Sequence, residues 1–302
     1  MTRAIVLSGL VLVGGLSVGL AGFQQPAAAR AALPDMQRVK DNLYMIEASS
    51  PVDRSKFTGG NVGVFITDAG VVVVDTKLAG YGPDIIARIR AVTNKPVTTI
   101  INTHTHGDHT GSNEAFAATV EFVAHENTKT HMMKMDAFKG DKAAFLPKRT
   151  YQEKMSLQSG KDQVDLYYFG AGHTNGDTWV VYPALRVLQT GDMFAWKDAP
   201  FIDRASGGSG VELPKTLAKA IAGIPNIDTI IPGHSPLMAP RDLAEYQRYA
   251  ADLVAGVEAA KKSGKSAADA LAGLNLSTKY PDYRTDRLKA AVDVIYAELD
   301  GK

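Results

Sequence analysis

The sequence predicts a protein of the α/β class, in which β-strands and helices alternate along the chain. Short apolar runs rich in β-branched residues recur between amphipathic segments. One of them is the unbroken valine quartet at 71–74, which is typical of a strand buried on both faces. Side chains that can bind metals directly follow several of these runs, and loops at strand ends are where a rigid sheet holds reactive groups.

The first half of the chain contains five predicted strands, at residues 43–47, 61–67, 71–74, 97–101 and 120–124. Residues 82–92 and 127–135 are predicted to be helices, and Ser112 or Asn113 is predicted to cap another helix. Residues 136–154 mix aromatic residues with lysines and have no clear period. We expect them to form a mobile segment over the mouth of a site.

The second half begins with a predicted hairpin formed by residues 155–157 and 164–169. Three further strands are predicted at 179–182, 186–188 and 227–231. The stretch 194–210 is irregular and carries Trp196 and Phe201, so we expect it to form a wall of a substrate pocket. Apolar residues then recur every three or four positions up to Leu299, which predicts helices. We expect residues 241–302 to be a helical extension packed on the same domain as structural cover, with one rim over the active site.

The N-terminus has the pattern of a secretory signal peptide that is cleaved after Ala29. A basic start containing Arg3 precedes twenty uncharged residues, 4–23, and a small-x-small site follows at 27–29. The alternative is an uncleaved membrane anchor, because twenty apolar residues can span a bilayer. Five glycines and the Ala-x-Ala site favour cleavage. We therefore expect a periplasmic or secreted protein without stable membrane insertion, with residues 30–240 as its main domain.

Composition excludes several classes of protein. Because the 302 residues contain no cysteine, the chain forms no disulfide, offers no thiolate ligand and carries no lipid on an N-terminal cysteine. Arg3 is the only charged residue in 1–29, so the rest of the chain has equal numbers of basic and acidic residues. A nucleic-acid surface usually shows a clustered basic excess, and we expect no nucleic-acid partner.

Four side chains that can bind metals lie within six positions, directly after the strand at 97–101: His104, His106, Asp108 and His109. Imidazole nitrogen and carboxylate oxygen are ligands that zinc and iron accept. In an extended segment His104 and His106 project the same way, whereas Gly107 allows a reversal that turns the next two residues towards a second point. The spacing therefore indicates one loop that supplies two adjacent metal ions.

Four side chains cannot fill two metal sites, and further candidate ligands follow later strands. His173, Asp192 and His234 each lie just past the end of a predicted strand, and glycines flank these motifs. Only two of the seven histidines remain outside these motifs, His125 and His131. Because the ligand set is complete without them, we expect His125 to be structural and His131 to belong to a packing face with neighbouring methionines.

The His-x-His-x-Asp-His motif, followed in order by His173, Asp192 and His234, resembles the metallo-β-lactamase-fold superfamily over residues 38–240. The resemblance implies an αββα four-layer sandwich with metals at one edge. It assigns His104, His106 and His173 to a first metal. It assigns Asp108, His109 and His234 to a second metal, with Asp192 bridging the two. It also implies that Asp75 accepts a hydrogen bond from a ligand histidine, the alternative being an ordinary turn aspartate.

Two divalent ions, expected to be Zn²⁺, imply a hydrolase without a side-chain nucleophile. Ions about 3.5–4 Å apart can share a water and lower its pKa towards neutrality, so that a metal-bound hydroxide attacks a carbonyl, phosphorus or sulfur. Asp108 would ligate one metal and orient this nucleophile. The chain has neither a Gly-x-Ser-x-Gly motif nor a cysteine, which agrees with this mechanism.

Asp192 guides the prediction of the bond that is cleaved. β-Lactamases of this superfamily usually carry cysteine or serine there, whereas aspartate is typical of its lactonase, thioesterase and phosphodiesterase branches. We therefore predict cleavage of a carbonyl ester, lactone, thioester or amide in a small-molecule substrate, with β-lactams not favoured as the main substrate and a phosphodiester as an alternative.

Two hypotheses from other functional classes are alternatives to the hydrolase. A mononuclear-iron oxidoreductase, similar to persulfide dioxygenases, would bind one iron rather than two zinc ions. A non-catalytic zinc-binding protein would lack a ligand, and none is missing.

Overall fold

The computed structural model describes residues 30–48, 53 and 55–301, so the predicted signal peptide lies outside the described residues. The first sheet has seven strands in the order β1-β2-β3-β4-β5-β6-β7. The strands are Met36–Lys40, Leu43–Ile46, Val62–Ile66, Val71–Val74, Val97–Ile101, Glu121–His125 and Arg149–Tyr151. The first four strands pair antiparallel, and β4 to β7 pair parallel. The valine quartet of β4 is fully buried, as its composition predicts.

The second sheet has five strands in the order β12-β11-β10-β9-β8. In chain order from β8 they are Lys154–Leu157, Val164–Tyr167, Trp179–Tyr182, Val187–Gly191 and Thr229–Pro232. β11 and β12 are parallel, and the other neighbours are antiparallel.

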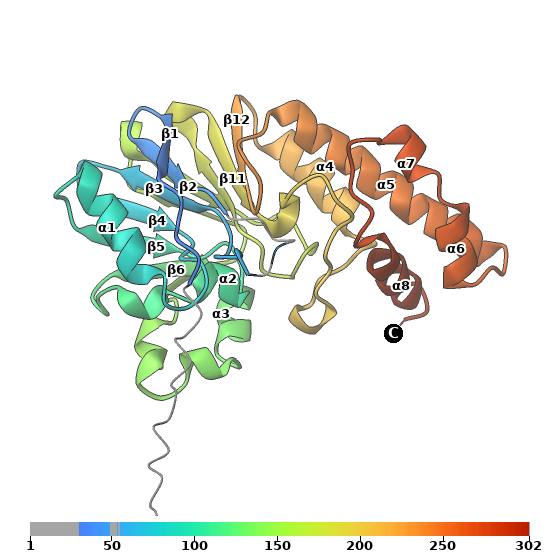
Figure 1. Cartoon of the computed structure of the whole chain (residues 1–302), viewed down its shortest axis with the longest axis horizontal. Coiled ribbons are helices and arrows are strands. Elements are labelled where there is room, and N and C mark those ends of the chain that lie inside the picture. Colours follow the sequence, from blue (N-terminus) through green and yellow to red (C-terminus); the bar gives the residue numbers. More distant parts are fainter. Residues whose placement is uncertain (1–29, 49–52, 54, 302) are drawn as a thin grey trace, which may run out of the picture. The chain divides into compact units, whose positions relative to one another are not determined.

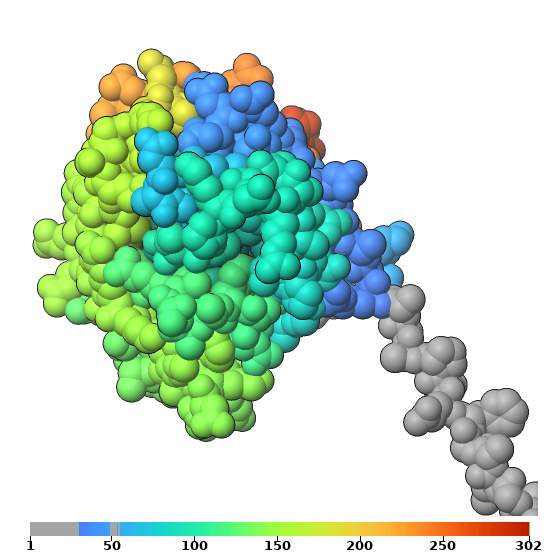
Figure 2. Space-filling model, turned by 90° about the vertical axis from the view of Figure 1, so that its left-hand side faces the viewer, coloured from blue at the N-terminus to red at the C-terminus, as the bar shows by residue number. Residues whose placement is uncertain are grey.

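Helices cover the outer face of each sheet, which gives the four layers of the predicted αββα sandwich (Figure 1). α1 (Gly82–Val92) packs Ile85 and Ile89 against the outer face of the first sheet. α4 (Leu213–Gly223) and α5 (Pro240–Lys262) cover the second sheet. Apolar side chains from the inner faces of both sheets form the core between them. Figure 2 looks onto the first sheet's side, where α1 (teal) and the green segment after β5 form the surface.

The C-terminal extension is helical, as predicted, and contains α6 (Ala267–Gly273), α7 (Leu276–Lys279) and α8 (Leu288–Glu298) after α5. α8 packs on α5 and α6 through the predicted apolar stripe, which includes Val292 and Ile295. In the part of the chain that the structure describes, no helix is long and apolar enough to cross a membrane.

Local structure differs from the sequence prediction in four places. The helix expected after Ser112 is a single 3₁₀ turn, because the Ser112 hydroxyl donates to Leu78 O and accepts from Tyr81 N–H instead of capping. The helix predicted at 127–135 is shorter and is α3 (Glu126–Met132). Residues 136–154, for which no regular element was predicted, contain 3₁₀ turns and the edge strand β7. Strand β1 was not predicted either.

The short helical turns are α2 (Gly107–Thr110), η1 (Asn113–Ala115), η2 (Asp136–Phe138), η3 (Gly140–Phe145), η4 (Gly160–Asp162), η5 (Pro183–Leu185), η6 (Asp192–Phe194) and η7 (Arg204–Ser206).

Candidate metal centre

The candidate ligands follow strands whose carboxyl ends meet at one edge of the sandwich. β4 and β5 are parallel neighbours, so Asp75 and His104 emerge close together. β11 and β12 are parallel in the other sheet and end just before Asp192 and His234. β9 runs in the same direction as β11, and the loop after it carries His173. Parallel strand ends therefore gather residues that are far apart in the sequence.

The seven candidate ligands form two adjacent groups, in each of which one ligand atom per residue lies within 4.8 Å of the others. The groups are His104, His106, His173 and Asp192, and Asp108, His109 and His234. His173 Nε2 lies 3.0 Å from His106 Nδ1 in the first group. His109 Nε2 lies 3.2 Å from His234 Nε2 in the second. Facing nitrogens at such distances repel unless a proton or a cation lies between them.

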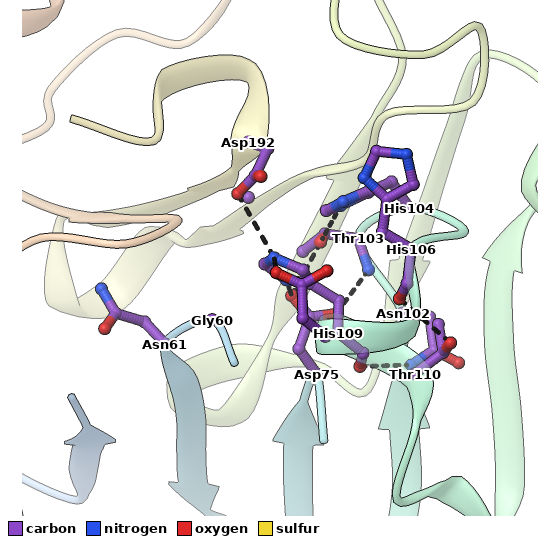
Figure 3. Close-up of polar contacts among 12 residues, drawn as sticks. Gly60, Asn61, Asp75, Asn102, Thr103, His104, His106, His109, Thr110 and Asp192 are labelled. Carbon is purple, nitrogen blue, oxygen red and sulfur yellow. Dashed lines mark hydrogen bonds and ion pairs between the residues drawn. The ribbon is translucent and has the colours of Figure 1, made fainter. Parts of the chain in front are cut away.

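Asp192 lies between the two groups. Its Oδ1 is 3.3 Å from both His109 Nε2 and His234 Nε2. Its Oδ2 is 3.8 Å from His173 Nε2. Figure 3 shows the carboxylate directed towards the His109 ring. Each oxygen of this one side chain therefore faces a different group of histidines.

Asp75 is hydrogen-bonded directly to His109 of the second group and, through Thr103, to His104 of the first. His109 Nδ1 donates to its Oδ2 over 2.7 Å, because a carboxylate can only accept. Thr103 Oγ1 donates to the same oxygen over 2.7 Å and lies 3.0 Å from His104 Nδ1, so the hydroxyl oxygen accepts from that ring (Figure 3). These bonds place a proton on the outer nitrogen of each ring, so that the inner nitrogen faces the other candidate ligands.

The other two histidines of the first group are held in the same way. His173 Nδ1 donates to Phe201 O over 2.7 Å. His106 Nε2 lies 2.9 Å from Asp203 Oδ2 and donates to it. Burial raises the pKa of Asp203, but hydrogen bonds from Ser206 and His106 outweigh it and lower the pKa to about 2. Asp203 had no motif or period around it, and only the fold brings it to His106.

Replacing Asp203 with asparagine is expected to weaken binding of the first metal by about 10- to 100-fold, the usual effect of losing a carboxylate behind a ligand histidine. Asparagine keeps the oxygen that accepts from Ala205 and Ser206, so the loop should still fold. Competition with a chromophoric zinc chelator measures the change. Asp165→Asn, at a buried aspartate of β9, is the matched control. Unchanged affinity in the Asp203 variant would rule out this role.

Lys77 is a second residue near the centre that the sequence does not single out. Its side chain is fully buried, and Nζ donates to Gly60 O over 2.9 Å and to Glu47 O over 3.0 Å. Burial lowers the pKa of Lys77 to about 7. The ammonium holds in place the loop whose Gly60 lies against the His109 ring.

Two glycines let the main chain approach the candidate ligands. A Cβ on Gly60 would lie 2.2 Å from His109 Cε1, and a Cβ on Gly233 would lie 2.0 Å from Asp192 Oδ1. Neither distance can be accommodated without moving the ligand. Glycine at positions 60 and 233 therefore allows the main chain to pass close to His109 and Asp192 without displacing them.

Gly233→Ala is expected to displace Asp192 and lower kcat/KM by about 100-fold, because small displacements of reacting groups have effects of this size. Metal analysis should show loss of bound metal at the same time. Gly107→Ala is the matched control for metal content, since a Cβ there meets nothing within 4 Å. Full metal content in both variants would contradict the role given to Gly233.

The two groups differ in their electrostatics. Burial, together with the neighbouring histidines, lowers the pKa of His104, and burial also lowers the pKa of His173. Burial would lower the pKa of His109 and His234 too, but nearby carboxylates, Asp192 above all, outweigh it and raise both. The same ion pairs outweigh the burial of Asp192 and lower its pKa. Burial therefore favours the neutral forms of His104 and His173, whereas the carboxylates of the second group favour the protonated forms of His109 and His234.

The donor set fits divalent metal ions. His104 Nε2 and Asp192 Oδ1 are buried and lack a hydrogen-bond partner among the described residues, which is costly for polar atoms unless a ligand satisfies them. Imidazoles with anchored outer nitrogens and carboxylates are the ligands of zinc sites. The two remaining histidines are used elsewhere. His125 Nε2 contacts Gln152 O over 2.8 Å, and His131 Nε2 contacts Asn175 Oδ1 over 2.8 Å.

A cavity of about 850 Å³ opens beside the candidate ligands. His106, Asp108, Asp192 and His234 form one part of its lining. Phe201, in the irregular loop after Asp192, forms another part, as predicted for that loop.

Comparison with known proteins now identifies the family. The family described as the metallo-beta-lactamase superfamily matches residues 56–234, which is more than half of the chain. The chain belongs to the metallo-β-lactamase superfamily. Its homologues are metal-dependent hydrolases, and so is this protein. Members of the superfamily bind divalent metals, typically zinc.

Named relatives lie within the same superfamily. The chain is 28% identical over 237 residues to the "Metallo-beta-lactamase type 2" of Elizabethkingia meningoseptica, covering 74% of this chain and 86% of the relative. It is 22% identical over 238 residues to the protein of the same name from Bacillus sp. (strain 170), covering 73% and 90%.

Solved structures share the fold. A metallo-β-lactamase from Pontibacter korlensis superposes with a TM-score of 0.62 at 19% identity, over 72% of this chain and 98% of the other. One from Hirschia baltica gives a TM-score of 0.60 at 17% identity, over 72% and 97%. More than a quarter of this metallo-β-lactamase-fold protein thus lies outside the matched part. α5 to α8 follow residue 234, where the family match ends.

Proposed function

We propose that this metallo-β-lactamase-fold protein is a dinuclear-zinc hydrolase that cleaves a carbonyl ester, lactone, thioester or amide. His104, His106 and His173 would hold one ion. Asp108, His109 and His234 would hold the other, and the Asp192 carboxylate would bridge the two. The position of Asp192 carries the proposal, because its two oxygens face separate groups of histidines. Bound ions of this kind supply Lewis acidity and lower the pKa of water.

Asp108 is the side chain proposed to orient the attacking water. Burial would raise its pKa, but His109 and His234 outweigh it and lower the pKa to about 2. The carboxylate is therefore ionised at neutral pH and can only accept hydrogen bonds. Because Asp108 also lines the cavity, its Oδ1 or Oδ2 can accept a hydrogen bond from the water that faces the substrate carbonyl.

The residue at position 192 supports the choice of bond. Aspartate there resembles the lactonase and thioesterase branches rather than β-lactamases, which usually carry cysteine or serine. Two relatives are nevertheless named "Metallo-beta-lactamase type 2", so a β-lactam amide is the second candidate substrate. Within the hydrolases, a phosphodiesterase remains the alternative in reaction class.

A hydrolysis panel on the zinc-loaded protein, residues 30–302, tests the proposal. The panel contains an aryl ester, an acyl lactone, a thioester, a chromogenic β-lactam and a phosphodiester, and metal analysis gives the ions per chain. We expect two zinc ions and turnover of a carbonyl substrate that chelation abolishes. Turnover of the phosphodiester alone would replace the carbonyl assignment. One tightly bound iron per chain would contradict the dinuclear-zinc site.

We also infer that the chain is exported and that its mature form begins at Arg30. The basis is the basic start and the small-x-small site in residues 1–29. The mature chain would comprise a main domain, 30–240, and the extension 241–302. N-terminal sequencing of the protein recovered from the periplasm or medium should start at Arg30. Recovery of the uncleaved chain from the membrane fraction would contradict the inference.

A further inference from the structure

α8 presents one face to the core and another to the cavity beside the candidate metal centre. Val292 and Ile295 pack against the other C-terminal helices. A second stripe lines the cavity, starts at the residue that precedes α8 and has the spacing i, i+3, i+4, i+7; it consists of Arg287, Ala290, Ala291 and Val294. Beyond Arg287 this stripe carries only small apolar side chains, so it forms a smooth hydrophobic wall.

Both ends of α8 are attached to the loop that follows Asp192. Near its C-terminus, Glu298 accepts from Gly210 N over 2.8 Å and also from the Ser209 hydroxyl. At its N-terminus, the Arg287 guanidinium lies 5.1 Å from the centre of the Trp196 ring and 5.6 Å from that of Phe201. These contacts hold the hydrophobic wall at a defined place next to the candidate ligands.

The other walls of the cavity are also apolar. Leu78 follows β4, Phe138 ends η2 and Phe145 ends η3. The Phe201 ring lies 5.8 Å from the His106 ring, where the apolar surface meets the ligands. Phe201 is 50% exposed, so a ligand that covers the ring would remove a large apolar surface from water.

The charges on the lining largely cancel. Glu114 and Lys142 form an ion pair of 2.6 Å with both side chains partly exposed. The Arg287 guanidinium lies over two aromatic rings, and its positive charge also acts on Asp198. Away from the candidate ligands, the described lining therefore favours hydrocarbon over a charged or strongly polar group.

We propose that this cavity binds the hydrocarbon chain of an acyl ester or acyl lactone, between α8 on one side and η2 and η3 on the other. The proposal rests on the hydrolase function above and places the scissile carbonyl at Asp108, Asp192 and His234. A cavity of about 850 Å³ is near the upper end of small-molecule sites and far exceeds what an acetyl group fills. α8 follows residue 234, where the family match ends.

Nitrophenyl esters with acyl chains from acetyl to decanoyl, kept below their micelle concentrations, test the proposal on the zinc-loaded protein. Each methylene taken out of water should raise kcat/KM by about two- to four-fold. Ala290→Trp fills the cavity from an exposed position on α8 and should abolish this rise. Lys289→Trp adds the same indole next to it but away from the lining, and should keep the rise.

A binding measurement separates this inference from the hydrolase proposal. Calorimetry of decanoate with the metal-free protein should detect binding that Ala290→Trp weakens at least ten-fold and Lys289→Trp does not. Equal turnover of all chain lengths would overturn the chain-binding proposal while leaving the hydrolase intact. Decanoate binding without hydrolysis of any ester would support the cavity and overturn the ester chemistry. Neither binding nor turnover would overturn both.

Discussion

Replacing Asp192 with asparagine is expected to lower kcat/KM by about 1,000-fold or more and to reduce the bound metal from two ions to one. Asparagine has the same size but lacks the negative charge that faces His109 and His234 at 3.3 Å. Losing one ion removes several kcal/mol of transition-state stabilisation, and about 1.36 kcal/mol corresponds to a factor of ten in rate. Metal analysis and steady-state kinetics on the best panel substrate measure both effects.

The control for this variant is again Asp165→Asn. It makes the same chemical change at a buried aspartate that accepts from Ser156 Oγ and Gln163 Nε2, outside the metal centre. It should retain two ions and full activity. Circular dichroism of both variants shows whether the fold is kept. An Asp192 variant that folds, binds two ions and keeps its activity would remove the central support for the proposed dinuclear site.

The second expected result is that the two metal ions bind with different pH dependence. Because burial lowers the pKa of His104 and His173, these rings are already deprotonated at neutral pH, and binding of the first ion should release few protons. The raised pKa of His109 and His234 means that the second ion must displace protons. Its affinity should therefore rise with pH, by about ten-fold per pH unit for each proton displaced, up to the raised pKa values.

Calorimetric zinc titrations in two buffers with different ionisation enthalpies count the protons released by each ion. We expect the second binding step to release more protons than the first between about pH 5.5 and pH 7.5, which is about one unit on either side of the ordinary histidine pKa. His234→Gln should remove the proton-linked step and leave the first. Equal proton release in both steps would contradict the assignment of neutral rings to one group and charged rings to the other.

The sequence alone was sufficient for the class of fold and for the residues that gather at the centre. The valine strand β4 has a composition that suits full burial, and the structure buries it. The His-x-His-x-Asp-His motif is local, so strand geometry already indicates a shared direction for His104 and His106. The reversal after them does not depend on glycine, because Gly107 begins the short helix α2 without a positive φ. His173, Asp192 and His234 could be recognised because each follows a strand, and loops at strand ends hold reactive groups.

Tertiary structure decided the features that depend on contacts between distant segments. Asp203 reaches His106 across 97 positions of sequence, and Lys77 reaches Gly60 through burial that no local pattern reveals. Serine is a residue type that often caps helices, but the Ser112 hydroxyl forms its hydrogen bonds with Leu78 O and Tyr81 N–H of the neighbouring loop instead. The second face of α8 has the spacing of any amphipathic helix, and only packing shows that it borders the cavity. Sequence periodicity reports which residues share a face, whereas the partner of that face is set by the whole fold.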